Sequence, residues 1–328
     1  MKAIKILTMA AMATAVFASC SNEDGLPQSN YPADNVVRIM TSVDGMNTRA
    51  SYGNSADKLK SFGFCIKNAN SEKYTYDNIK VSQKGYNWIP ANQMLWQNST
   101  TAVDILAYAP YQETTEDATG KVKVFGKTDY AFSVKEDQSN AEDYSSDLIV
   151  FKQTGFTPVS ELNTSKAVEV AFTHLLSQLN LIIELRDQFN TNNNTVTKGF
   201  VTDVKVNGTI ISSKVDFSAS PISVQVDGTQ TAAITPETTG FTPAENATAH
   251  AVFNYSAIVI PQTVAAGNFS ISFKVNNTEY IWTATDAVTF ESGKKHELHL
   301  LAGKDVVQGG AISAKPWGKE TITEKETD

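Results

Sequence analysis

Cysteine and histidine are scarce in this sequence of 328 residues, which limits the chemistry it can carry. Its two cysteines, Cys20 and Cys65, cannot form a multi-disulfide scaffold, so packing has to hold the fold together. Among the four histidines, only His296 and His299 have spacing resembling a metal site, and on a strand that spacing directs their rings to opposite faces. His250 stands alone in a predicted loop. We therefore expect no metal and no cofactor.

The sequence also has no excess of positive charge, and it lacks common enzyme motifs. The formal net charge is −8, which argues against nucleic acid or anionic lipid as a partner. The sequence has no Gly-x-Ser-x-Gly elbow and no phosphate-binding glycine loop. Five acidic residues near one another could supply a glycosidase pair, but they are more typical of a solvated loop: Glu136, Asp137, Glu142, Asp143 and Asp147. We expect no enzymatic activity.

Long hydrophobic runs are absent after the first seventeen residues. Lys2 and Lys5 precede an apolar run, Ile6 to Phe17, that is short for a membrane span and typical of a signal peptide. Ala18-Ser19-Cys20 follows at once and looks like a lipobox. The sequence predicts a signal peptide over 1–19, a lipid on Cys20 and a polar tether over 20–34.

Apolar and polar residues alternate through most of the remaining chain, which predicts half-buried strands and an all-β fold. The clearest runs cover residues 37–43, 62–66, 103–107, 130–134, 168–172, 179–185, 204–206, 224–226, 269–275, 280–282 and 298–300. Asn207-Gly208, Asp227-Gly228 and Asn276-Asn277 predict tight turns between strands. At most a short helix is expected within His174 to Gln178. Many short strands with such turns are typical of β-sandwiches and barrels.

The polar stretch from Gln153 to Lys166 is the best candidate for a domain boundary. We predict an N-terminal β-sandwich domain over 35–160 and a C-terminal β-sandwich domain over 161–328.

Several short motifs occur in an order that resembles one family, the fimbrillin-like lipoproteins that build type V pili in Gram-negative anaerobes. The motifs are Thr48-Arg49-Ala50, Ala107-Tyr108-Ala109-Pro110-Tyr111, Asp137-Gln138-Ser139, Ser146-Asp147-Leu148, the run from Phe172 to Leu179, and Trp317 after Pro316. The resemblance implies two tandem transthyretin-like β-sandwich domains. It also implies delivery to the cell outer membrane as a surface-exposed lipoprotein, followed by proteolysis and incorporation into a fimbrium.

In that family an arginine-specific protease removes the first strand, and another subunit's C-terminal segment fills the groove. The matching bond here is Arg49–Ala50. The removable strand would carry Val37, Ile39 and Val43, whose packing is worth on the order of 5–9 kcal/mol at about 1.5–3 kcal/mol per side chain. The tail after Leu301 is rich in small residues and makes a poor donor strand, so a tip or accessory subunit is favoured over a stalk subunit.

The resemblance makes other pilus subunits the expected partners, together with a ligand on a host or bacterial surface. The alternative function is that of a surface glycan-binding β-sandwich lipoprotein. Its aromatic candidates are Trp88, Trp96, Tyr76, Tyr86 and Tyr111.

Overall fold

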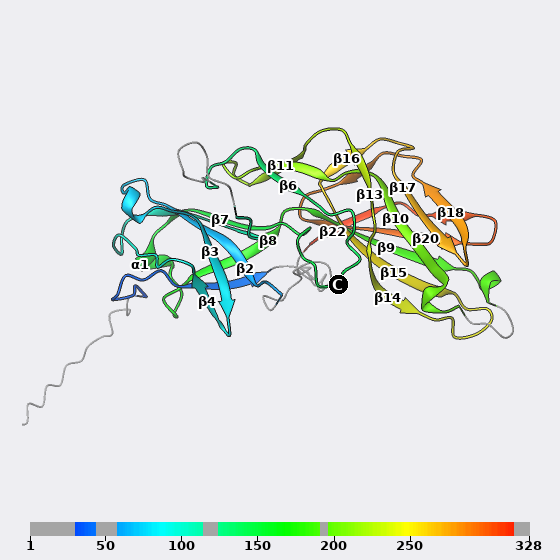
Figure 1. Cartoon of the computed structure of the whole chain (residues 1–328), viewed down its shortest axis with the longest axis horizontal. Helices are drawn as coiled ribbons and strands as arrows, with labels where there is room; N and C mark the ends of the chain where they lie inside the picture. Colours follow the sequence, from blue (N-terminus) through cyan, green and yellow to red (C-terminus); the bar gives the residue numbers. More distant parts are fainter. Residues whose placement is uncertain (1–29, 44–57, 114–123, 191–195, 318–328) are drawn as a thin grey trace, which may run out of the picture.

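The computed structural model describes residues 30–43, 58–113, 124–190 and 196–317. They form an elongated, nearly all-β molecule, with β2, β3, β4 and β7 in one half of Figure 1 and β9, β14, β15, β18 and β20 in the other. The predicted all-β class is confirmed. Helical structure in the described ranges consists of α1 (Pro158–Glu161) and three 3₁₀ turns, Glu72–Tyr74, Asp187–Phe189 and Lys198–Phe200.

The first half is built on a seven-stranded sheet with the order β1-β8-β7-β5-β2-β3-β4. Its strands are β1 (Ile39–Val43), β2 (Ser61–Lys67), β3 (Tyr76–Lys84), β4 (Asn87–Pro90), β5 (Val103–Ala109), β7 (Ile149–Phe156) and β8 (Val168–His174). Only the outermost pair, β1 and β8, is parallel.

The central strands of this sheet are buried on both faces. One face of β5 contributes Ile105 and Ala107 to a core shared with β1, β2 and β8, while Leu106 and Tyr108 on its other face join the large core of the second half. The half-buried environment predicted for β2 and β5 is therefore wrong. Alternation of apolar and polar residues located these strands from one buried face. It did not reveal that the other face is also covered by a second layer.

The second half contains a six-stranded sheet and a four-stranded sheet. The larger sheet has the order β14-β15-β9-β20-β21 with β22 also on β20, and the smaller one has the order β13-β10-β17-β18. Their strands are β9 (Ser177–Leu185), β10 (Val201–Ile210), β13 (Thr231–Ile234), β14 (Glu237–Thr242), β15 (Ala251–Val259), β17 (Ser270–Val275), β18 (Thr278–Thr283), β20 (Lys294–Ala302), β21 (Val307–Gly309) and β22 (Ser313–Pro316). A two-stranded sheet joins β16 (Gln262–Val264) to β19 (Val288–Phe290).

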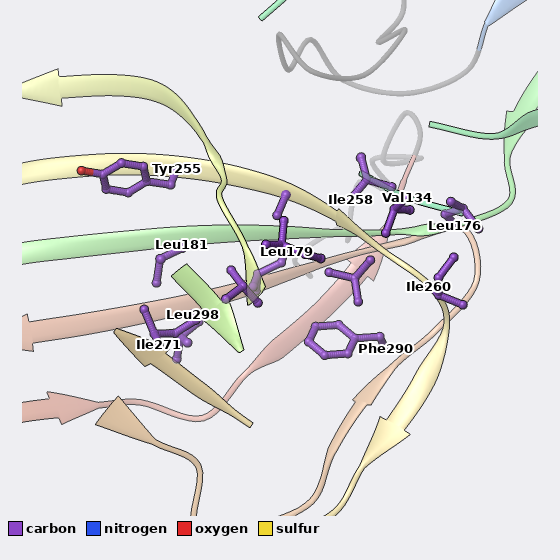
Figure 2. Close-up of a cluster of buried hydrophobic side chains, with 14 of the residues drawn as sticks. Val134, Leu176, Leu179, Leu181, Tyr255, Ile258, Ile260, Ile271, Phe290 and Leu298 are labelled. Carbon is purple, nitrogen blue, oxygen red and sulfur yellow. The ribbon is translucent and has the colours of Figure 1, made fainter. Parts of the chain in front are cut away.

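The core of this half lies between the sheets. Figure 2 shows Leu179 and Leu181 of β9, Leu298 of β20 and Ile271 of β17 gathered with Phe290. These side chains belong to the alternating runs of the sequence, so period-two patterning correctly located the inward faces of β9, β17 and β20.

Two strands pair with strands from the other side of residue 160, the predicted domain boundary. β8 follows that residue but pairs with β1 and β7 in the seven-stranded sheet. β6 (Tyr130–Ser133) precedes it but pairs with β11 (Ser212–Asp216), which in turn pairs with β12 (Ser223–Val226). Tyr108, Tyr130 and Phe217 pack together between these layers with ring centroids 5.0–5.7 Å apart. Division into two transthyretin-like domains over 35–160 and 161–328 remains a prediction.

The predicted turns have different outcomes. Asn276-Asn277 forms the expected hairpin between β17 and β18, with positive φ at both residues. Asn207-Gly208 instead lies inside β10 at a register shift, which makes it a bulge rather than a hairpin. Gly208 has a φ of 90°, and a Cβ there would lie 2.0 Å from the Asn268 carbonyl oxygen. The helix expected within His174–Gln178 is also absent, because β8 ends at His174 and β9 begins at Ser177.

Candidate functional site: the first strand and its groove

The first strand, β1, forms an edge of the seven-stranded sheet and has one strand partner, β8. Ile39 lies opposite Val168 and Val43 lies opposite Phe172 in the parallel ladder. Val37, Ile39 and Val43 are 2%, 6% and 4% exposed, whereas Met40 between them is 47% exposed. The sequence therefore placed the three apolar residues on one inward face, and the structure brings them together in the core of the first half.

Aromatic rings form much of the bed beneath β1. Phe172 of β8 packs against Phe62 with centroids 5.3 Å apart, and Phe62 packs against Trp88 of β4 at 5.1 Å. Loss of β1 would leave this aromatic row with water on one side. Apolar surface of that kind favours binding of another apolar strand.

A second contact fixes the start of β1 to the opposite edge of the sheet. The backbone N–H of Val37 donates to the Met94 carbonyl at 3.0 Å, and Trp96 N–H donates to the Asn35 carbonyl at 2.8 Å. These bonds join the segment just before β1 to the segment after β4, at the far edge of the seven-stranded sheet.

A groove of about 780 Å³ opens between these two edges. Its size falls in the range typical of ligand sites. The lining residues come from β1, the β3–β4 hairpin and two nearby loops: Val36, Val37, Arg38, Ile39, Met40, Thr41, Gln83, Tyr86, Asn87, Trp88, Ile89, Pro90, Gln93, Met94, Ser165 and Ala167. No sequence pattern predicts this groove, because the groove depends on which two strands become the edges of the sheet.

The residues expected to undergo lipidation and cleavage lie outside the described residues. They are Cys20, Arg49 and Ala50. In the sequence, the predicted cleavage position lies between β1 and β2. Both modifications remain predictions.

The five aromatic residues predicted for a glycan platform occupy different environments. Trp96 is 2% exposed and stacks on Phe156, and the Tyr76 hydroxyl bonds to the backbone of Leu95, so both serve the fold. Tyr111 lies beside Lys80 and is only half-buried. Tyr86, which is fully exposed, and the half-buried Trp88 both line the groove.

The last described strands fold back onto their own chain. β21 and β22 both pair with β20, and the Trp317 N–H donates to the Gly293 carbonyl at 2.9 Å. The Trp317 ring stacks on His174 of β8 with centroids 3.9 Å apart and an angle of 4°. His174 Nδ1 lies 2.9 Å from Asp147 Oδ1 in a fully buried pair. This stack, which we call the C-terminal clasp, comprises Trp317, His174 and Asp147.

The C-terminal clasp shows that the solvated loop predicted for the acidic segment is wrong at Asp147. Asp147 is buried and paired with His174, so it does not belong to a solvated loop. The other four acidic residues of the segment are not buried. His250 is also not solitary: its Nδ1 bonds to Glu184, whose other carboxylate oxygen lies 2.6 Å from His299 Nε2. Glu184 of β9, His299 of β20 and His250, which directly precedes β15, thus lie together on an outer face of the six-stranded sheet.

His296 and His299 lie on opposite faces of β20, as predicted. His296 is 1% exposed and accepts a hydrogen bond from the Glu291 N–H through Nε2. Burial lowers the pKa of His296, and the Glu291 carboxylate offsets this only in part. Within the described ranges, no group of three or more histidine, cysteine or acidic side chains is arranged to hold a metal ion. The described helices likewise include none of membrane-spanning length and hydropathy.

Acid is expected to destabilise the fold through His296. Below its usual pKa of about 6.5 the unfolded histidine takes up a proton that the folded one resists, so stability is lost as the pH falls from there. The drop in Tm between pH 7.5 and pH 5 should be smaller in His296→Gln than in wild type. His299→Gln, on the exposed face, should retain at least the wild-type drop. Equal drops in wild type and His296→Gln would contradict this assignment.

Comparison with known proteins agrees with this nearly all-β, multi-sheet architecture. A profile of the fimbrillin-like family matches residues 48–317, and the chain belongs to this family. No curated protein sequence gave a match.

Three solved structures share the fold at low sequence identity. A fimbrial protein from Bacteroides vulgatus is 18% identical with a TM-score of 0.54, over 85% of this chain and 99% of that one. Proposed cell adhesion proteins from Bacteroides uniformis and Bacteroides ovatus are 18% and 14% identical, with TM-scores of 0.54 and 0.58. Each match covers 87% of this chain, and 99% and 98% of the respective structures. At these identities the likeness concerns the fold.

Proposed function

We propose that this protein is a structural and adhesive subunit of a type V-like pilus, delivered to the outer membrane by a lipid on Cys20. The observation that carries the proposal is the edge strand β1, which has one partner among the described strands; Ile39 and Val43 of β1, and Val37 just before it, lie in the core. Such a strand leaves behind a continuous apolar groove when it is removed. Membership of the fimbrillin-like family supports this reading.

The proposed assembly step is cleavage of Arg49–Ala50, loss of β1, and entry of a strand from another pilus subunit beside β8. Parallel pairing with β8 would give the incoming strand a backbone ladder, and the bed around Phe62 and Phe172 would receive its apolar side chains. The processed subunit would then reside in the fimbrium. No enzymatic step by this chain is required.

A tip or accessory position suits the C-terminal tail better than a stalk position. β21 and β22 are occupied on β20 of their own chain, and Trp317 is buried in the C-terminal clasp. β22 presents four exposed residues, Ser313–Pro316, with no large apolar side chain to fill a neighbour's groove. A tip subunit receives a strand and donates none.

Mass spectrometry of the mature N-terminus tests the proposal. Protein from assembled fibres should begin at Ala50, and Arg49→Ala should instead retain the lipidated Cys20 and give no heat-stable, high-mass oligomers on denaturing gels. Arg186→Ala, at the end of β9, is the matched control and should be processed normally. Wild-type fibres that still contain residues 36–43 would refute removal of the strand.

A further inference from the structure

The groove between β1 and the β3–β4 hairpin is lined mainly by uncharged residues. Arg38 is the one charged residue among the described residues that line it, and its guanidinium is neutralised by Asp34 through bonds of 2.7 and 3.0 Å. The polar groups that remain are amides and hydroxyls, from Gln83, Asn87, Gln93, Thr41 and Ser165. This composition offers nothing to balance a charged ligand and many partners for a polar, neutral one.

Several of these polar groups can take part in hydrogen bonds to a ligand. The Thr41 hydroxyl is buried and has no hydrogen-bond partner. Gln83 is half-buried and Asn87 and Gln93 are exposed, so their amides are accessible to a ligand in the groove. A buried hydroxyl without a partner carries a free-energy cost that a ligand hydroxyl could remove.

Two aromatic rings accompany these polar groups. Tyr86 stands fully exposed at the tip of the β3–β4 hairpin, and Trp88 is held edge-on by Phe62 at 5.1 Å. Such rings combine an apolar face with a polar edge, which suits packing against the C–H faces of a sugar ring. We infer that this groove binds a neutral oligosaccharide.

An extended peptide is a poorer fit, because both edges of the groove offer little backbone for a strand. Arg38 directs its carbonyl to β8 and Val37 is bonded to Met94, so by alternation Ile39, Thr41 and Val43 of β1 present free backbone groups, and of these Ile39 and Thr41 line the groove. On the other edge, Pro90 of β4 lacks an N–H. Ile39 and Thr41 on the β1 edge and a proline on the β4 edge leave too few backbone groups for a β-ladder with a bound peptide.

The inference goes beyond the proposed assembly step and assigns a ligand class to the chain before processing. It also adds a condition, because residues 36–41 of the removable segment form one wall of the groove. The saccharide site therefore belongs to the chain that retains β1.

A glycan array probed with the unprocessed full-length chain tests the inference, with calorimetry on the strongest neutral oligosaccharide. Neutral glycans should bind in preference to sialylated, sulfated or uronic ones. Tyr86→Ala and Gln93→Ala should each weaken binding by about tenfold or more, which corresponds to about 1.4 kcal/mol. Gln225→Ala, an exposed glutamine on β12, should bind like wild type.

Three outcomes would overturn the inference: no neutral glycan bound, binding confined to acidic glycans, or wild-type affinity in both groove variants. Capture of an alternating Thr-Val octapeptide without any glycan would make the groove a peptide site instead. Processing at Arg49 and oligomer formation are scored on the same preparations. Normal fibres with no glycan binding would reject only the saccharide site, whereas glycan binding without fibres would reject only the pilus role.

Discussion

A chain cut after Arg49 and stripped of its first strand is expected to lose about 5–9 kcal/mol of unfolding free energy. Val37, Ile39 and Val43 are almost fully buried, and each such side chain contributes about 1.5–3 kcal/mol. Since domains are typically stable by about 5–15 kcal/mol, the stripped chain should lie near the limit of folding. Urea unfolding of the intact and stripped chains measures the difference.

Cleavage can be restricted to one bond, because the sequence contains three arginines, Arg38, Arg49 and Arg186. In an Arg38→Lys/Arg186→Lys background, an arginine-specific protease can cut only at Arg49. Chain that is nicked but still holds its first strand serves as the control and should keep most of its stability. An unchanged urea midpoint after β1 has been removed would show that this strand is not part of the core.

Trp317→Ala is expected to cost about 3–5 kcal/mol, the usual range for a buried tryptophan. The Trp317 ring covers His174, so its loss would also expose the buried Asp147–His174 pair to water. β22 would lose its anchor, and backbone amides of Lys294–Glu297 in β20, which pair with β22, should exchange hydrogen faster. Urea unfolding and hydrogen exchange by mass spectrometry check the two effects.

Trp317→Phe provides the matched variant, because it keeps a ring that can stack on His174. Its loss of stability should be clearly smaller than that of Trp317→Ala, and exchange in β20 should stay close to wild type. If the alanine variant matched wild type in both stability and exchange, the clasp would have no structural role.

Alternation in the sequence was sufficient to locate the strands that have one strongly apolar face. β9 is the clearest case, since Leu179, Leu181, Ile183 and Leu185 are all buried. Strands without this pattern were missed. β4 reads Asn-Trp-Ile-Pro and β22 reads Ser-Ala-Lys-Pro, and both are held by their neighbours rather than by an apolar stripe.

Contacts between distant segments could not be predicted. The pairing of His174 with Asp147 joins residues 27 apart, and each side chain alone reads as ordinary. Trp317 stood out in the sequence as a conspicuous residue near the tail, but only the fold shows that it stacks on β8. Similarly, Asn207-Gly208 has the composition of a hairpin turn, yet close approach of the Asn268 backbone places it in a bulge.

The pairing of β6 with β11 has a mechanical consequence. A strand from the first half of the chain is hydrogen-bonded into a sheet of the second half, and Tyr108, Tyr130 and Phe217 interlock beside it. The two halves therefore cannot separate freely when the molecule is pulled from its two ends. Extension must first break a backbone ladder together with a buried aromatic cluster, which gives a surface filament a stiff link rather than a hinge.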